Sequence, residues 1–201
     1  MLVPDARYVL PYGAIDPLTA ASAACSGLTA YSALRKLPPA TRDDVIALIG
    51  AGGLLAALGL VRHLTPARVA VIDNNDAKLE LARQHADLVL NICDEDTAAA
   101  LRAFGGGGVF GVVDFVGTAQ TLEWGMGAMR KGGTLIEVGL FGGSISLSVP
   151  LLPMRNLKLV GPMSDPWRSS SNCWRCLAAS RSGRCHSLHA PCRRSTRSSR
   201  T

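Results

Sequence analysis

The sequence lacks the features that mark membrane and secreted proteins. No apolar run reaches the length needed to span a bilayer, and the opening residues MLVPDARY do not form the charged-then-apolar pattern of a signal peptide. We therefore expect a cytoplasmic protein without a membrane partner. The length of 201 residues is sufficient for one domain with a substantial hydrophobic core.

A second absence marks the C-terminal stretch. From Pro162 onward the sequence contains no Val, Ile, Phe, Tyr, Glu or Lys, whereas it holds eight Arg, one acidic residue and four of the six Cys. Residues 162–201 therefore carry a net charge of +7, and residues 1–161 carry 13 Lys and Arg against 14 Asp and Glu, a net charge of −1. The overall charge of +6 comes from this tail alone, so the two parts need separate explanations.

Three interpretations of the tail compete. A zinc module is suggested by its Cys and His residues, but their spacing is irregular and no core accompanies them. A basic nucleic-acid arm is suggested by the arginines, but neither lysines nor regular spacing support it, so we do not expect a nucleic-acid partner. We favour a frameshift, because a neighbouring reading frame permits an amphipathic helix such as YVGSLEELVELLAL. As written, the tail buries too little apolar surface to fold and is expected to be disordered. The candidate zinc ligands are Cys173, Cys176, Cys185, His186, His189 and Cys192.

The body of the chain alternates strand and helix patterns. This alternation predicts an α/β protein with a doubly wound, six-stranded parallel sheet covered by helices on both faces. The predicted strands are Val45–Ile49, Arg68–Ile72, Leu88–Asn91, Val109–Phe115, Gly133–Gly139 and Leu157–Val160. The predicted helices are Asp16–Leu37, Leu54–Leu64, Asp76–His85, Glu95–Phe104 and Gln120–Met129.

The most informative segment is the unit DVIALIGAGGLLAALGLVRHLTPARVAVID, residues 44–73. It predicts a strand, a Gly-rich turn, a helix and a second strand that ends in Asp73. Such a turn brings backbone amides and a helix N-terminus to a pyrophosphate, and the acidic residue is placed to bind a ribose diol. With no adjacent Arg, Asp73 favours NAD, since a carboxylate repels a 2′-phosphate. Leu55 departs from the small residue expected at the third position of the motif.

Two loops and two cysteines remain open on chemistry alone. The loops Val116-Gly117-Thr118 and Val138-Gly139-Leu140 follow strands, where ligand contacts or ordinary turns both occur. Cys25 is either a metal ligand or a small buried residue, and residue chemistry alone favours burial. Cys93 lacks a partner pattern and is expected in the core.

Taken together, the motifs resemble those of the zinc-type, medium-chain alcohol dehydrogenase family. The resemblance covers about Val3 to Gly161 and rests on ACSGLTAYSAL, VIALIGAGGL, VAVIDNNDAKLELA, DFVGTAQTL and KGGTLIEVGLFGG, in that order and spacing. It implies a Rossmann domain over residues 25–161, preceded in residues 1–24 by the end of a GroES-like catalytic domain. Residues 162–201 form a separate, aberrant tail in this division.

The resemblance also implies roles for individual residues. Cys25 corresponds to a catalytic zinc ligand, and Thr29 to a residue beside the nicotinamide. Lys78 lies on the adenosine-ribose side. The full set of implied NAD-binding residues is Thr29, Gly50, Gly52, Gly53, Leu54, Asp73, Asn74, Lys78, Val116, Val138, Gly139 and Leu140.

The implied function is an NAD-dependent oxidoreductase that exchanges a hydride between an alcohol and the cofactor, with an aldehyde or ketone as the other partner. Catalytic zinc needs about three protein ligands, of which this sequence supplies only Cys25. We therefore expect a truncated, inactive cofactor-binding fragment, and the alternative is a noncatalytic dinucleotide-binding module. By the same resemblance, Asn156–Val160 is expected to pair across a homodimer axis, whereas the substrate's identity is not specified.

Overall fold

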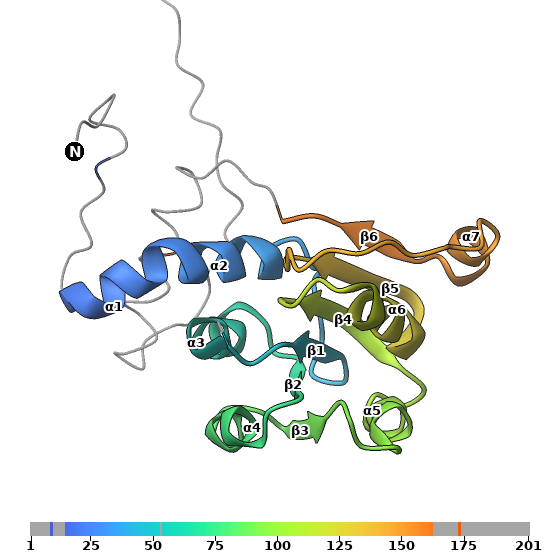
Figure 1. The fold of residues 1–201 in the computed structure, drawn as a ribbon, viewed down its shortest axis with the longest axis horizontal. Coiled ribbons are helices and arrows are strands. Elements are labelled where there is room, and N and C mark those ends of the chain that lie inside the picture. The colour runs from blue at the N-terminus through green and yellow to red at the C-terminus, as the bar shows by residue number, and fades with distance from the viewer. Residues whose placement is uncertain (1–8, 10–14, 53, 163–172, 174–201) are drawn as a thin grey trace, which may run out of the picture.

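Six parallel strands form the centre of the molecule, as the computed structural model shows for residues 9, 15–52, 54–162 and 173 (Figure 1). The strand order is β3-β2-β1-β4-β5-β6, so the chain crosses over between β3 and β4. This order is that of a doubly wound dinucleotide-binding sheet, and it confirms the predicted fold class. The strands are β1 Val45–Ile49, β2 Arg68–Asp73, β3 Leu88–Asn91, β4 Val109–Asp114, β5 Met129–Glu137 and β6 Lys158–Val160.

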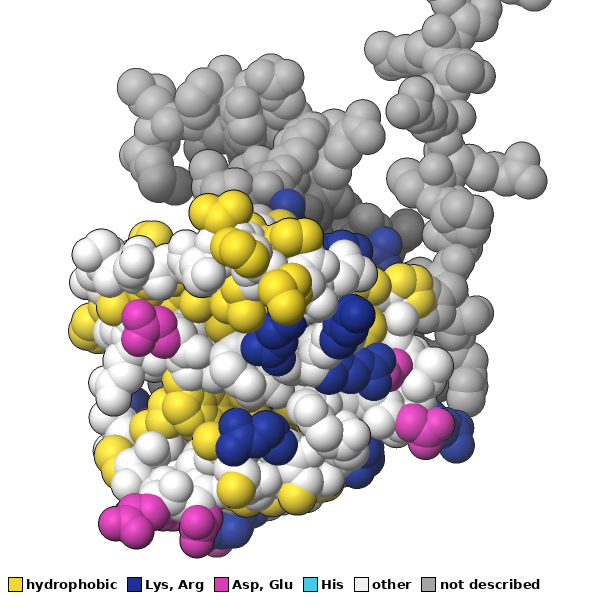
Figure 2. Space-filling model, turned by 90° about the vertical axis from the view of Figure 1, so that its right-hand side faces the viewer, with side chains coloured by type: hydrophobic (Ala, Val, Ile, Leu, Met, Phe, Trp, Pro, Cys, Tyr) yellow, Lys and Arg dark blue, Asp and Glu magenta, His cyan; other side chains and the backbone are white. Residues whose placement is uncertain are grey.

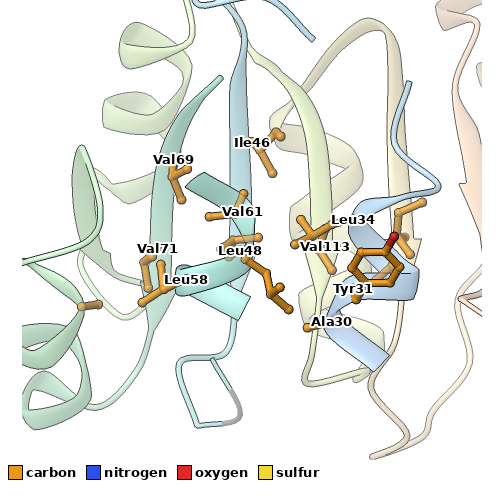
Figure 3. Close-up of a cluster of buried hydrophobic side chains, with 14 of the residues drawn as sticks. Ala30, Tyr31, Leu34, Ile46, Leu48, Leu58, Val61, Val69, Val71 and Val113 are labelled. Carbon is orange, nitrogen blue, oxygen red and sulfur yellow. The ribbon is translucent and has the colours of Figure 1, made fainter. Parts of the chain in front are cut away.

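Helices cover both faces of the sheet, which explains why the central strands are apolar along their whole length. Side chains of β1 alternate between the two cores: Ile46 and Leu48 face one, and Val45 and Ile49 the other. In the first core, α2 and α3 pack together against β1, β2 and β4 (Figure 3). The helical elements are α1 Pro17–Ser22, the π-helix η2 Ala23–Gly27, α2 Leu28–Leu34, α3 Leu54–Leu64, α4 Asp76–Ala82, α5 Thr97–Phe104, α6 Ala119–Ala128 and α7 Leu151–Arg155.

The predicted helix over Asp16–Leu37 is present as three consecutive helical segments, α1, η2 and α2. Its start is explained by Asp16, whose carboxylate accepts hydrogen bonds from the amides of Leu18 and Thr19 at 3.1 and 3.0 Å. The π-helical turn in the middle contains Cys25. Such turns are rare and have no simple sequence signature, so the small residues of this segment do not reveal it.

The strand β5 begins four residues earlier than expected. The motif Lys131-Gly132-Gly133, at the start of the predicted strand Gly133–Gly139, lies inside β5 opposite a register shift in β4. Met129 pairs with Val109 and Thr134 pairs with Gly111, so the additional residues of β5 form a bulge. Gly132 has a φ of 81°, which a glycine adopts without strain.

Two further differences concern helices. The helix α7 was not predicted, since its sequence LLPMR is short and contains a proline. The helix α4 ends at Ala82, three residues before the predicted end.

Of residues 162–201, the structure describes Pro162 and Cys173, so the expected disorder of the tail lies outside the described residues. Cys173 is buried in the first core. In the described ranges, no helix combines the length and apolar character needed to cross a bilayer.

Candidate functional site

A cleft of about 800 Å³ opens where the carboxyl ends of β1, β2, β3 and β4 meet. It lies at the point where the strand order reverses between β1 and β4, which is where open α/β sheets bind ligands. Its size falls within the range of cofactor pockets. It is lined by Ile49, Gly50, Gly52, Ile72, Asp73, Asn74, Lys78, Ile92, Cys93, Phe115, Val116, Thr118, Gln120, Thr121 and Phe141.

The Gly-rich turn after β1 forms the floor of this cleft. Gly50 has a φ of 92°, and its amide donates a 2.8 Å hydrogen bond to the Ile72 carbonyl. A Cβ atom at Gly50 would lie 2.7 Å from Cγ2 of Val116, so only glycine fits there. The helix α3 starts at Leu54, directly after the turn, and its N-terminal amides provide the positive end of a helix dipole. Gly53 and the side chains of Leu54 and Leu55 lie outside the described part of the chain.

Asp73 joins the turn to the end of β2. Its Oδ2 accepts a 2.5 Å hydrogen bond from the Ala51 amide, and its Oδ1 accepts one of 2.9 Å from the Asn75 amide. The carboxylate is 7% exposed and lies on the cleft wall, with Nζ of Lys78 at 4.0 Å. Because a carboxylate offers about four acceptor positions, Asp73 keeps acceptor capacity for ligand hydroxyls. Asn74 lies on the same wall.

The loop after β4 forms the opposite wall. Phe115, Val116 and Thr118 line the cleft, and Thr118 begins α6 through a reciprocal cap with Thr121. The predicted residues Val138, Gly139 and Leu140 follow β5 and stand behind this wall without lining the cleft. Gly117 and Gly139 bring the two loops into backbone contact.

An acidic pair lies under these two loops. Asp114 ends β4 and pairs in register with Glu137 of β5. Burial, together with the charge of Asp114, raises the pKa of the Glu137 carboxyl to about 7. The amides of Gly139 and Val138 lower this pKa by less, as nearby dipoles, since their hydrogen bonds go to the Asp114 carbonyl. This pair is not evident from the sequence, although both acidic residues stand at strand ends where apolar residues would be expected.

The two remaining predicted residues do not line the cleft. Cys25 is exposed on the π-helical turn, and Thr29 is half-buried in α2. Within the described ranges, no group of three or more His, Cys, Asp or Glu side chains is arranged to hold a metal ion. One thiol does not satisfy the coordination of zinc, so the described residues do not fit a catalytic zinc site.

Several residues of the cleft were missed from the sequence. Cys93 was expected in the core, but it is exposed and lines the cleft beside Ile92. The expectation failed because Cys93 follows β3, whose carboxyl end lies next to that of β2. Applying the strand-end rule to every strand would have found it. Gln120 and Thr121 at the start of α6 follow from the same rule.

Comparisons with known proteins agree with this geometry. A family model described as zinc-binding dehydrogenase matches residues 53–179. The NAD-dependent alcohol dehydrogenases of Sulfurisphaera tokodaii and Saccharolobus solfataricus are each 30% identical over 169 residues, which cover 81% of this chain and 48% of each relative. The chain therefore spans about half the length of the curated relatives it matches.

Solved structures resemble the chain over a similar extent. The D-arabinose dehydrogenase from Sulfolobus solfataricus superimposes with a TM-score of 0.80 at 25% identity, covering 91% of this chain and 57% of that one. The alcohol dehydrogenase from Aeropyrum pernix gives a TM-score of 0.72 at 27% identity, covering 87% of this chain and 51% of its own.

Proposed function

The chain belongs to the zinc-binding dehydrogenase family, and we propose on this premise that residues 25–161 are the NAD-binding domain of an alcohol dehydrogenase. The observation that carries the proposal is the position of Asp73. Its buried carboxylate stands on the cleft wall and is bound to the amide of Ala51 in the Gly-rich turn. One residue thus fixes the turn that would hold the pyrophosphate and faces the space that a ribose would occupy.

NAD fits the cleft better than NADP. The carboxylate of Asp73 would accept hydrogen bonds from the 2′- and 3′-hydroxyls, whereas a 2′-phosphate would be repelled. Lys78 is the one cationic side chain among the described residues that line the cleft, and it already lies 4.0 Å from Asp73. We propose that Asn74 and Lys78 contact the adenosine ribose.

The remaining predicted residues have secondary roles in this proposal. Gly50, Gly52, Gly53 and Leu54 would hold the pyrophosphate. Val116, with Val138, Gly139 and Leu140 behind it, would form the wall beside the nicotinamide, and Thr29 would approach that ring from α2. When bound, NAD would accept or deliver the hydride exchanged with an alcohol or an aldehyde.

The chain by itself is proposed to be inactive toward alcohols. Cys25 is the one ligand of the catalytic zinc that the resemblance assigns to this sequence, and alcohol oxidation in this family requires a metal that polarises the substrate oxygen. A noncatalytic dinucleotide-binding module is the second candidate. The cleft supports it equally, because Asp73 and the Gly-rich turn would hold a dinucleotide whether or not the chain catalyses a reaction.

Two measurements test these proposals. Titration with NADH, followed by its fluorescence, is expected to show saturable binding that is at least tenfold weaker for NADPH. Turnover of simple alcohols is expected to be undetectable with NAD and added zinc. Turnover that disappears on addition of a chelator would contradict the proposed inactivity, and equal affinity for both cofactors would contradict the role of Asp73.

A homodimer through Asn156–Val160 remains part of the proposal. The strand β6 is one of the two edges of the described sheet, the other being β3, and Leu159 at the centre of β6 is 39% exposed. An open edge strand is suited to pair with a second copy. Figure 2 shows hydrophobic and basic side chains close together on the side of the molecule where α7 and β6 lie. Sedimentation equilibrium would detect this dimer, and a Pro substitution at Leu159 is expected to abolish it.

The composition of residues 162–201 calls for a separate proposal. We propose that residues 162–201 reflect a frameshift, on the ground of their abrupt change in composition. Sequencing the gene would test it: a selected reading frame with synonymous bias through this stretch would contradict the frameshift.

A further inference from the structure

Three buried carboxylate oxygens at the ends of β4 and β5 have no hydrogen-bond partner in the described part of the chain. They are Oδ2 of Asp114 and both carboxylate oxygens of Glu137. Asp114 is 0% exposed, and the two residues are register partners on neighbouring strands. Neighbouring strands lie about 4.8 Å apart and register partners point to the same face of the sheet, which brings the two carboxyl groups within reach of each other. Two buried carboxylates cannot both stay ionised at such a distance without a large cost.

Asp114 also holds the two loops that follow these strands. Its Oδ1 accepts hydrogen bonds from the amides of Val116 and Gly117 at 2.8 and 3.2 Å. Its main-chain carbonyl accepts hydrogen bonds from the amides of Val138 and Gly139 at 2.8 and 3.0 Å. Four amides from both loops are therefore bound by this one residue.

The two loops pack main chain against main chain, with no room for a side chain at Gly117 or Gly139. A Cβ atom at Gly117 would lie 2.2 Å from the carbonyl carbon of Gly139, and one at Gly139 would lie 2.0 Å from that of Val116. The outer loop continues the contact, because the Gly142 amide donates a 2.8 Å hydrogen bond to the Gly117 carbonyl. A shift of Asp114 is thus transmitted to Val116, which lines the cleft.

We propose that Asp114 and Glu137 form a positioning pair that holds one proton between them and thereby fixes the cleft wall at Val116. The Glu137 hydroxyl donates to Oδ2 of Asp114, and the proton comes from solvent when the chain folds. This gives one unpartnered oxygen of each residue a partner, and it leaves Oδ1 of Asp114 free to accept the two amides. The identity of the ligand in the cleft, NAD, rests on the proposed function. The existence of the Asp114–Glu137 pair does not depend on it.

The electrostatic surroundings favour a proton at this place. Burial and, after it, the charge of Asp114 raise the pKa of Glu137 to about 7. Other charged groups on the neighbouring elements are exposed: Glu123 on α6, Arg130 and Lys131 at the opposite end of β5, and Lys158 on β6. The half-buried Arg155 of α7 lies at that opposite end of β5, where its guanidinium donates to the carbonyls of Met126 and Met129.

The sign of the pH effect follows from linkage. The folded-state pKa of Glu137 lies above its ordinary value of 4.5, so the folded chain binds more protons between these values. The contribution of the pair is fully present below about pH 4.5 and is lost as the pH rises through about 7. For one proton, the folding equilibrium constant falls by at most about tenfold per pH unit in this window.

The test compares wild type with Glu137→Gln and with the matched control Glu123→Gln, which makes the same change at an exposed glutamate of α6. Urea unfolding is measured from pH 5 to pH 8.5 for the three full-length chains. The glutamine amide can donate to Oδ2 of Asp114 but does not titrate. We expect the ratio of wild-type to Glu137→Gln folding constants to fall by several-fold per pH unit up to about pH 7, whereas Glu123→Gln follows wild type. Parallel profiles for wild type and Glu137→Gln would overturn the proposal.

A second readout tests positioning. Amide hydrogen exchange at Val116 and Gly139, measured at pH 8, is expected to be slower in Glu137→Gln than in wild type, because only the variant keeps the donor to Asp114. The NADH dissociation constant is expected to rise with pH in wild type and to stay constant in the variant. If no chain binds NADH, the proposed function fails, and the exchange rates still decide the pair. Should Glu137→Gln not fold, the carboxyl carbon shift of wild-type Glu137 decides it: a midpoint near pH 7 supports the pair, and one near 4.5 overturns it.

Discussion

Replacing Gly139 with alanine tests the backbone contact that joins the two loops of the cleft wall. The added Cβ would lie 2.0 Å from the Val116 carbonyl carbon and 2.2 Å from both the Gly117 nitrogen and the Val116 oxygen. Carbon atoms normally approach to about 3.5 Å, so the loops must separate by more than one ångström. All three atoms belong to the main chain, and no side chain can rotate away to relieve the overlap.

The expected cost has two parts. Overpacking against rigid neighbours costs about 1–3 kcal/mol. Separating the loops also weakens the hydrogen bonds from the amides of Phe141 and Gly142 to the carbonyls of Val116 and Gly117, each contributing about 1 kcal/mol. The sum is about 3–5 kcal/mol, a large share of the stability of a domain of this size.

Urea unfolding followed by circular dichroism measures this cost directly. Gly161→Ala is the matched control, because a Cβ atom there would have no heavy atom within 4 Å. We expect the control to unfold within about 0.5 kcal/mol of wild type. If the unfolding free energy of Gly139→Ala also stays within about 0.5 kcal/mol of wild type, the two loops are not in the contact described.

Three further predictions concern the cleft and the sheet. Asp73→Asn is expected to weaken NADH binding by roughly 10- to 100-fold, because a charged acceptor contributes about 1.5–3 kcal/mol, and to narrow the preference over NADPH; unchanged calorimetric affinities would contradict this. NAD is expected to protect Cys93 from alkylation while leaving the exposed Cys25 reactive, as peptide mass mapping would show, and equal labelling of Cys93 with and without NAD would place the cofactor elsewhere. Arg130→Gln removes a 2.6 Å ion pair with Asp44 and is expected to cost about 1 kcal/mol at pH 7. Burial raises the pKa of Asp44, but hydrogen bonds from Thr41 and the Arg130 guanidinium outweigh it, so the pKa lies below 3.8. The pair's contribution is present above pH 3.8 and lost as the pH falls further, and acid unfolding curves of equal steepness for wild type and variant would refute it.

The sheet was predictable because its strands are buried on both faces. Continuous apolar runs such as Val45–Ile49, separated by helical patterns, leave few arrangements other than a parallel α/β sheet. The bulge in β5 was not predictable, because Lys131-Gly132-Gly133 is equally typical of a turn. Such glycines can form a turn or a β-bulge. The outcome depends on the strand that pairs with them, here β4, which is distant in the sequence.

The candidate site was predictable where a motif fixes the backbone. Gly50 and Asp73 belong to one strand–turn–helix–strand unit, in which Asp73 accepts a hydrogen bond from the Ala51 amide, and both residues line the same cleft. Ile92 and Cys93 were missed because their place depends on the pairing of β3 with β2. The Asp114–Glu137 pair was missed for the same reason, since only the register of β4 and β5 makes two acids 23 positions apart into neighbours.

Isothermal titration calorimetry of the chain with NADH and NADPH at pH 6.5 tests the central claim most directly. The account predicts heat from a single site for NADH, with binding at least tenfold weaker for NADPH and reduced in Asp73→Asn. A folded chain that releases no heat with either nucleotide would contradict it.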